Sequence, residues 1–277
     1  MLLTRVITAV VVLVVLLGML FFASAQAWSL FMLAVALVGC WEWSRMSGLG
    51  PRGQSVFLFL SGAIGAAFWL LYARGSSAFG EAATLASVLS ATFWILFVPL
   101  WLGTRARPAA VICALAGWLV MWPTWFAFMQ LRDAGPWLLL AVAALVWIAD
   151  ISAYCAGRTF GRHKLAPAIS PGKTWEGVYG AAAGVVLYGF LLLWSGHSPV
   201  SAIFGGDAGP ILIVAMLVLT ALSIVGDLFE SWIKRGAGVK DSSGLLPGHG
   251  GVLDRIDALT STLPVAAFAL TMQAARS

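Results

Sequence analysis

The sequence predicts an all-α, polytopic integral membrane protein, and three observations lead to this fold class. Of the 277 residues, 61% are hydrophobic and only 10% are charged, whereas soluble domains have roughly 45–50% apolar and about 25% charged residues. Apolar runs long enough to span a bilayer recur along the chain. They lack the period-two alternation of a transmembrane barrel, and a backbone in hydrocarbon must satisfy its own hydrogen bonds, so we expect helices.

Nine helices follow from where these runs begin and end. The first run, Val6 to Ala23, is followed by small residues that resemble a signal-peptide cleavage site, but its 18 residues are enough to span, so we expect a retained helix. Later runs end at clusters of Gly, Pro and Arg, which punctuate helices. In chain order these breaks are 48–52, 74–75, 105–108, 132–136 and 205–210. The expected helices are 5–24, 27–44, 55–72, 82–102, 109–130, 136–157, 177–195, 209–230 and 256–273.

The basic residues divide unequally between the two sides of the membrane. If alternate connections are assigned to opposite sides, the side that holds the N-terminus receives 13 of the 16 Lys and Arg residues, and the other side receives Arg74, Arg132 and Arg276. Lys and Arg accumulate on cytoplasmic loops, so we expect the N-terminus in the cytosol. The net charge of +5 is then explained by the membrane and not by nucleic acid.

The two halves of the chain differ in charge. Residues 1–135, with about five helices, are expected to be a transmembrane scaffold, because the first 149 residues contain no lysine and no acidic residue deep in a span. Glu42, one turn from the end of its helix, is expected to pair with Arg45. The expected catalytic transmembrane domain is 136–277, with cytosolic loops 158–176 and 231–255.

Two windows concentrate the charged residues. Residues 150–176 and 227–257 hold 15 of the 27 charged residues, including all four lysines, and both fall on the expected cytosolic side. Clustered charges beside membrane helices are costly and usually functional. We therefore expect the chemistry in these windows, although composition and topology alone leave enzyme and transporter equally open.

The first window combines an intramembrane carboxylate with a turn suited to phosphate. Asp150 falls in the middle of the sixth helix, where a carboxylate is expensive unless it faces a cation or a wet cavity. The Gly-Lys-Thr triplet at Lys173 and Thr174 suggests a P-loop, but Pro167 occupies the position of the required first Gly, and we expect no strand before it. What remains is a turn that precedes a helix N-terminus, which can hold a phosphate.

The second window places carboxylates at two helix ends. Asp227 lies at the cytosolic end of the eighth helix, and Asp254 and Asp257 share one face at the start of the ninth. Carboxylates flanked by Lys and Arg suit a divalent cation together with a polyphosphate, because Mg²⁺ keeps few protein ligands and takes the rest from phosphate and water. The Gly-rich turn around His249 can bring backbone N–H groups close to an anion.

Simpler interpretations of the same residues remain open at this point. Lys234, Arg235 and Lys240 can form an ordinary patch for anionic lipids. Asp227 and Glu230 can pair with Arg235 and Lys234 across one helix turn.

From Ser231 to Asp257 the second window resembles the signature of the phosphatidate cytidylyltransferase family, also called CDP-diacylglycerol synthase. The pattern runs Ser-x-hydrophobic-Lys-Arg, then Lys-Asp, Pro-x-His-Gly-Gly and Asp-Arg-x-Asp. The matching residues are Ser231, Lys234, Arg235, Lys240, Asp241, Pro247, His249, Gly250, Gly251, Asp254, Arg255 and Asp257. The first window is similar to the family's Asp…Ala-Tyr…Gly-Arg-x-Phe-Gly and Ile-Ser-Pro-x-Lys-Thr-x-Glu-Gly segments, with Cys155 where an aromatic is common.

The resemblance implies a reaction and a set of site residues. A phosphate oxygen of phosphatidic acid attacks the α-phosphorus of CTP and gives CDP-diacylglycerol and pyrophosphate. The nucleophile is already anionic near neutral pH, so positioning and charge neutralisation should carry the catalysis. The implied catalytic residues are Asp227, Asp254, Lys240, Arg255 and His249. The implied substrate-binding residues are Lys173, Thr174, Arg235, Lys234, Ser231, Gly250 and Gly251. The implied Mg²⁺ ligands are Asp227, Asp254, Asp257 and Asp150.

The resemblance also implies the setting of the protein. We expect CTP and phosphatidic acid as substrates, Mg²⁺ with a second cation such as K⁺, contact with membrane lipids, and a homodimer. The expected location is the bacterial inner membrane, with several spans and the active site facing the cytosol. A related CTP-dependent kinase of the polyprenol type would leave CDP instead of pyrophosphate. A transporter would need paired polar positions at mid-bilayer or inverted repeats, and the first 149 residues offer neither.

Overall fold

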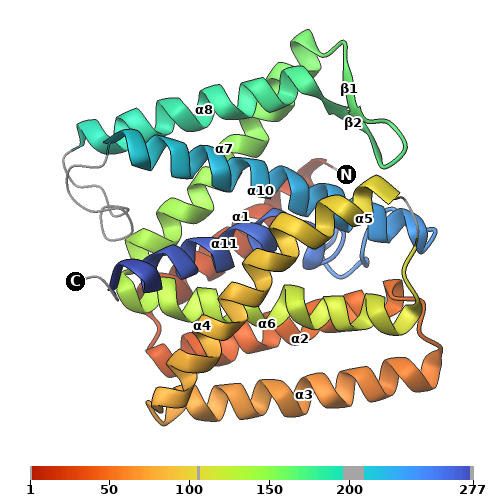
Figure 1. Cartoon of the computed structure of the whole chain (residues 1–277), viewed down its shortest axis with the longest axis vertical. Coiled ribbons are helices and arrows are strands. Elements are labelled where there is room, and N and C mark those ends of the chain that lie inside the picture. Colours follow the sequence, from red (N-terminus) through yellow and green to blue (C-terminus); the bar gives the residue numbers. More distant parts are fainter. Residues whose placement is uncertain (1, 105–106, 196–208, 275–277) are drawn as a thin grey trace.

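The computed structural model describes residues 2–104, 107–195 and 209–274 and has the expected helical membrane architecture. Nine long helices make up this described part (Figure 1). They are α1 (Leu2–Phe22), α2 (Ala25–Met46), α3 (Pro51–Ala73), one continuous helix built from α4 (Ser77–Thr92), the π-helical turn η1 (Phe93–Phe97) and α5 (Val98–Thr104), α6 (Ala110–Ala134), α7 (Pro136–Phe160), α8 (Trp175–Trp194), α10 (Gly209–Gly236) and α11 (Leu253–Ala274). Each coincides with one expected helix.

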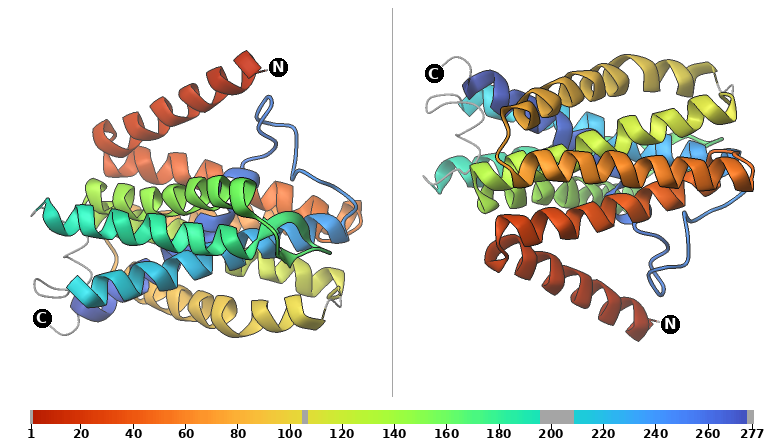
Figure 2. Two further views of the ribbon diagram at one scale, coloured as in Figure 1. Left: turned by 90° about the horizontal axis from the view of Figure 1, so that it is seen from above. Right: turned by 90° about the horizontal axis from the view of Figure 1, so that it is seen from below.

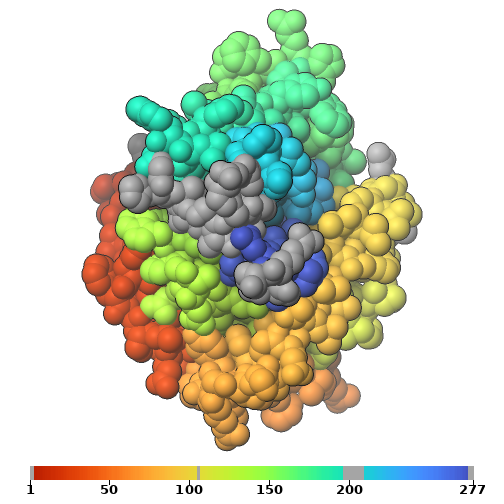
Figure 3. Space-filling model, turned by 60° about the vertical axis from the view of Figure 1, so that its left-hand side comes forward, coloured from red at the N-terminus to blue at the C-terminus, as the bar shows by residue number. Residues whose placement is uncertain are grey.

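Among the described helices, all except α11 are long and apolar enough to cross a membrane. α11 carries Asp254, Asp257 and the hydroxyl residues 260–262. Those hydroxyl residues are buried, and Ser261 Oγ donates to the carbonyl oxygen of Leu222 at 2.8 Å. α11 packs against α10, α6 and α4, with further contacts to α7 and α2 (Figure 1). In Figure 3 the blue end of this helix emerges between the differently coloured segments that pack around it. A helix that is shielded from lipid in this way does not need an apolar surface.

A short hairpin interrupts the helices between α7 and α8. Its strands β1 (Lys164–Ala166) and β2 (Ser170–Thr174) pair antiparallel. The expectation that no strand precedes Lys173 and Thr174 is therefore wrong, because residues 167–169 turn the chain back and β2 contains both residues. Pro167 and the antiparallel pairing still distinguish this segment from a P-loop.

An aromatic cluster fixes the rotation of α10. Phe229 is almost fully buried, and its ring centroid lies 5.7 Å from that of Phe93, 5.5 Å from Trp94 and 6.1 Å from Trp101. These three rings come from η1 and α5, so the widened helical turn faces α10 at this point. Because Phe229 lies between Asp227 and Ser231, the cluster also sets where the polar residues of α10 point.

α2 is held against α6 by an indole ring. An added Cβ at Gly117 of α6 would lie 2.3 Å from Cδ1 of Trp43, so only glycine allows this approach. Nε1 of Trp43 donates to the carbonyl oxygen of Cys113 at 2.8 Å. The neighbouring residue, Glu42, is thereby fixed inside the bundle, with 0% of its surface exposed.

The charged connections meet at one end of the bundle. The N-terminal end of α1, the β1–β2 hairpin and the connection between α10 and α11 lie together there, and the C-terminal end of α11 lies at the opposite end (Figures 1 and 2). α10 continues to Gly236, six residues beyond its expected end, and α11 begins at Leu253. The connection is therefore 237–252, and the predicted site residues Ser231, Lys234 and Arg235 lie on a helix.

Candidate active site

Three carboxylates from three helices face one another at this polar end. Asp150 of α7, Asp227 of α10 and Asp257 of α11 are near enough to interact electrostatically. Lys173 of β2 forms an ion pair with Asp227, with its Nζ 2.6 Å from Oδ2. Ser231 Oγ donates to the other oxygen of Asp227 at 3.3 Å. The Lys173–Asp227 pair thus joins the two charged windows of the sequence.

Lys234 is the buried cation of the site. The residue is only 8% exposed, and its Nζ lies 3.2 Å from Glu230 Oε2 and 2.6 Å from Asp254 Oδ1. The pairing of Glu230 with Lys234 along one helix turn is therefore present, whereas Asp227 pairs with Lys173 and not with Arg235. Buried ions need such partners because an uncompensated charge there is costly.

Asp254 fastens the α10–α11 connection to the start of α11. Its Oδ2 accepts hydrogen bonds from Ser242 N at 2.9 Å, Ser242 Oγ at 2.9 Å and Gly251 N at 2.7 Å. Its Oδ1 is the partner of Lys234. Both carboxylate oxygens therefore already bind protein donors, and a metal ion at Asp254 would have to compete with them.

Glu42 makes contacts that the sequence interpretation missed. Its carboxylate accepts hydrogen bonds from Ser243 Oγ at 2.5 Å, Ser242 Oγ at 3.1 Å, Val252 N at 2.9 Å and Leu253 N at 2.7 Å. The expected pair with Arg45 is wrong, because Glu42 points into the bundle while the Arg45 guanidinium lies 5.0 Å from the centroid of the exposed Trp41 ring. The sequence did contain one signal for these contacts: an acidic residue within an otherwise apolar helix.

Two adjacent glycines allow these carboxylates to approach the connection. Gly250 has φ +80°, and an added Cβ there would lie 2.5 Å from Asp254 Oδ2. At Gly251 an added Cβ would lie 2.1 Å from Ser242 Oγ and 2.2 Å from Glu42 Oε1. Both predicted substrate-binding glycines therefore have a demonstrable role in closing the connection around Glu42 and Asp254.

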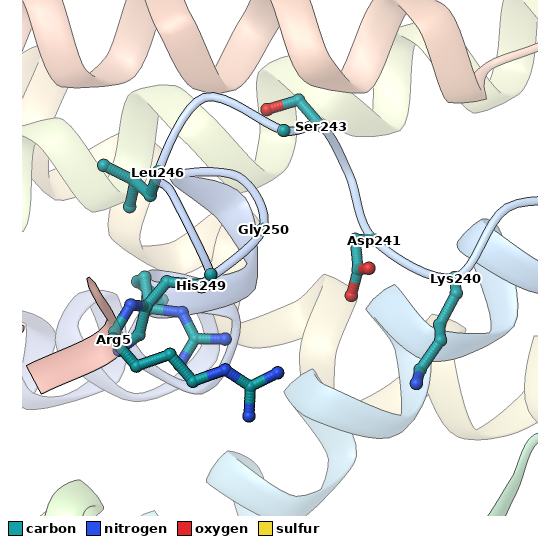
Figure 4. Close-up of a pocket in the computed structure, with 10 residues that line it drawn as sticks. Arg5, Lys240, Asp241, Ser243, Leu246, His249 and Gly250 are labelled. Atoms are coloured by element: carbon teal, nitrogen blue, oxygen red, sulfur yellow. The ribbon is translucent and has the colours of Figure 1, made fainter. Parts of the chain in front are cut away.

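A polar pocket of about 560 Å³ opens beside this connection. Lys240 and Asp241 line one side, and Arg5 and His249 lie together on the other (Figure 4). Arg255 of α11 also lines the pocket. The pocket thus gathers three predicted catalytic residues, Lys240, His249 and Arg255. It also contains Arg5, which is one of the 13 basic residues on the N-terminal side of the membrane and was not a predicted site residue.

Two other predicted site residues lie outside this pocket. Thr174 is buried and caps α8, where its hydroxyl accepts a hydrogen bond from Gly177 N at 3.2 Å. Arg235 donates to the carbonyl oxygen of Val239 at 3.0 Å and so supports the start of the connection. Neither residue lines the pocket.

The carboxylates of the site suit a hard cation that prefers oxygen ligands and completes its coordination with ligands from outside the protein. In the described parts of the chain, no three Asp, Glu, His or Cys side chains converge closely enough to hold a metal by themselves. Asp150, Asp227 and Asp257 nevertheless repel one another, with Lys173 as the nearby counter-charge. Mg²⁺ commonly takes one or two carboxylates and completes its shell with water and substrate phosphates, so the donor set fits Mg²⁺.

Comparison with known proteins identifies the family to which the chain belongs. The sequence profile of the Cytidylyltransferase family matches residues 3–273. The chain is 40% identical over 271 residues to the phosphatidate cytidylyltransferase of Pseudomonas aeruginosa, covering 96% of this chain and 95% of that protein. It is 34% identical over 283 residues to the phosphatidate cytidylyltransferase of Haemophilus influenzae, covering 95% and 96%. With the whole helical body and both charged windows inside these matches, the chain belongs to the cytidylyltransferase family.

Proposed function

We propose that this protein transfers CMP from CTP to phosphatidic acid and releases CDP-diacylglycerol and pyrophosphate. The observation that carries the proposal is the meeting of a cationic pocket and a carboxylate group at one polar end of a membrane bundle. The full-length relatives named phosphatidate cytidylyltransferase support the same reaction. One substrate is a membrane lipid and the other is a water-soluble polyanion, and a site at the bundle end is accessible to both.

The residues of this chain act mainly by binding and orienting two anions. Lys240, Arg255 and the His249 turn line the pocket and are proposed to neutralise phosphate groups. Lys173 is proposed to exchange Asp227 for a phosphate of CTP, because its partly exposed ion pair lies at the hairpin. Arg235, Lys234, Gly250 and Gly251 act indirectly in this scheme, since they shape the connection. Held in place, the lipid phosphate needs no strong base to attack the α-phosphorus of CTP.

Mg²⁺ is proposed as the cofactor. Asp227, Asp257 and Asp150 would hold it, and when bound it would supply positive charge to the CTP phosphates. Asp254 can join these ligands only by exchanging Lys234 at Oδ1, since Oδ2 accepts three bonds from the connection. A second cation such as K⁺ remains part of the proposal, on the resemblance alone.

The setting proposed for the enzyme is the bacterial inner membrane with the site facing the cytosol. The excess of basic residues on the N-terminal side supports this orientation, and the relatives named above are bacterial. A homodimer is proposed from the resemblance. The exposed apolar side chains of α8, such as Leu187 and Phe190, suit lipid or a second copy equally.

Product analysis tests the reaction. Purified protein in mixed micelles, given CTP, phosphatidic acid and Mg²⁺, should form CDP-diacylglycerol and pyrophosphate in equal amounts. Formation of CDP would reject the proposal in favour of a lipid kinase. CTP consumption that does not require phosphatidic acid would reject it as well.

The metal assignment has its own test. Asp227→Asn should abolish Mg²⁺-dependent conversion while the protein still accumulates in the membrane, because the variant loses a carboxylate ligand and keeps the shape. Glu81→Gln is the matched control, since Glu81 is exposed near the N-terminal end of α4, away from the site. Full activity in Asp227→Asn would overturn the assignment.

A further inference from the structure

The pocket contains more positive charge than the protein itself neutralises. Arg5, Lys240 and Arg255 line it, against the single carboxylate of Asp241. Among the described residues, none of these three cations forms an ion pair or a side-chain hydrogen bond. Nδ1 of His249 is also buried without a hydrogen-bond partner in the described structure. Groups arranged in this way are set up to bind an anion from outside the chain.

Arg5 reaches the pocket from an unusual helix. α1 exposes most of its apolar residues, including Leu3 at 71% and Val10 at 53%. In Figure 2 it diverges from α2 toward its N-terminus, and the α10–α11 connection extends to meet it. Thr8 Oγ1 donates to the carbonyl oxygen of Pro247 at 3.1 Å, which fixes this meeting.

The contact between Arg5 and the connection is close. Gly248 has φ +76°, and an added Cβ there would lie 2.8 Å from Cγ of Arg5. The Arg5 side chain therefore lies across the turn that carries His249 (Figure 4). This packing places a guanidinium from a lipid-exposed helix beside the residues that line the pocket.

We propose that Arg5 binds the phosphate of phosphatidic acid, with His249, Lys240 and Arg255 completing the binding site. The proposal deepens the function proposed above and rests on it. Arg5 is the pocket cation that belongs to a lipid-exposed helix, so it lies where a lipid phosphate stands while its acyl chains remain in the bilayer. A phosphomonoester carries about −1.5 to −2 charges near neutral pH, which matches a pocket with several unpaired donors. Arginine suits this role because its fork can bind two phosphate oxygens at once.

Steady-state kinetics in mixed micelles test the assignment. Arg5→Gln should raise the KM for phosphatidic acid on the order of tenfold, the effect of losing one charge-assisted contact, and leave the KM for CTP unchanged. Arg5→Lys should give a smaller increase, since it keeps the charge and loses the fork. Arg52→Gln is the control, because it removes an exposed charge at the first turn of α3, away from the pocket.

A direct binding measurement separates a binding role from a structural one. Short-chain phosphatidic acid should bind the purified wild-type protein without CTP, and Arg5→Gln should weaken this binding by a similar factor. Diacylglycerol of the same chain length, which has no phosphate, should not compete. If Arg5→Gln fails to accumulate, Arg5→Lys carries the same test.

Several results would overturn the inference. They are an unchanged KM for phosphatidic acid in Arg5→Gln, a KM effect on CTP instead, or a loss confined to kcat. If the wild-type protein converts both substrates and Arg5→Gln gives any of these results, the role of Arg5 in phosphate binding is rejected and the proposed function stands. A wild-type protein that converts neither substrate would reject the function itself.

Discussion

The connection between α7 and α8 folds back on itself, whereas the connection between α10 and α11 is held by residues from distant parts of the chain. The first is a hairpin whose end is closed by Trp175 N donating to His163 O at 2.9 Å and by Glu176 Oε1, 2.7 Å from His163 Nδ1. The second has one isolated bridge, Leu246 with Gly250, and depends on the buried carboxylates of Glu42 and Asp254. A connection without regular structure can thus be as well fixed as a hairpin, but its stability depends on a few side chains.

The largest effect should follow from removing the cation that holds Asp254. Lys234→Met leaves Glu230 and Asp254 buried without their partner, which should cost about 3–5 kcal/mol of unfolding free energy. The melting temperature of the purified protein in detergent measures this loss. Lys240→Met is the matched control for stability, since Lys240 is exposed and its ammonium group has no ion-pair partner in the described chain. An equal loss of stability in Lys234→Met and Lys240→Met would contradict the special role of the buried ion pairs in the α10–α11 connection.

Glu42→Gln should have the next largest effect. The amide keeps the size of the side chain but replaces an acceptor oxygen with a donor, facing Val252 N, Leu253 N and two serine hydroxyls. We expect a loss of about 2–3 kcal/mol in stability, measured by chemical denaturation, together with reduced turnover. Arg45→Gln should change neither quantity. If Arg45→Gln matched Glu42→Gln, a local pair and not the long-range anchor would be responsible.

Alanine substitutions at two glycines, one in each connection, allow the two connections to be compared directly. Gly251→Ala places a Cβ against Glu42 and Ser242, so it should cost about 1–3 kcal/mol by overpacking. Gly172→Ala in the hairpin meets nothing within 4 Å and should be nearly neutral. Melting temperatures of the two variants measure the contrast. A larger loss for Gly172→Ala would show that the hairpin is the more tightly constrained connection.

The smallest effect is expected at the end of the hairpin. His163 is 78% exposed, so solvent screens its contact with Glu176. Glu176→Gln should therefore leave the melting temperature unchanged, at low and at high salt. A clear, salt-dependent loss would mean that the hairpin also depends on a single side-chain anchor.

The sequence predicts much of this fold because lipid imposes simple requirements on the chain. Length and apolarity are enough to locate nine helices, and even α11 is found although its hydroxyl residues are inside the bundle. The two charged windows are predicted because ionic residues are rare elsewhere. Helix ends are less well predicted, as the extension of α10 through Ser231 and Arg235 shows: a polar, amphipathic turn continues a helix where hydrophobicity alone ends it.

The long-range contacts of the site could not be predicted in the same way. Glu42 and its partners are 200 residues apart in sequence, so no local pattern connects them. Arg5 resembles any basic residue at a membrane surface until the connection is seen to pack against it. The glycines of the signature suggested phosphate binding. The structure adds a packing reason for them, because Asp254 and Glu42 leave no room for a side chain at Gly250 and Gly251.

The distance of Glu42 from its partners also has a consequence for biogenesis. A ribosome that adds roughly 5–20 residues per second needs about 10–40 s to travel from Glu42 to the serines that bind it. During that interval α2 is already available for insertion while its carboxylate has no partner, and a position one turn from the helix end lets water solvate it. Synthesis of the α10–α11 connection and of the start of α11 then supplies the donors that bind Glu42, so the anchoring of the site is completed long after α2 has been made.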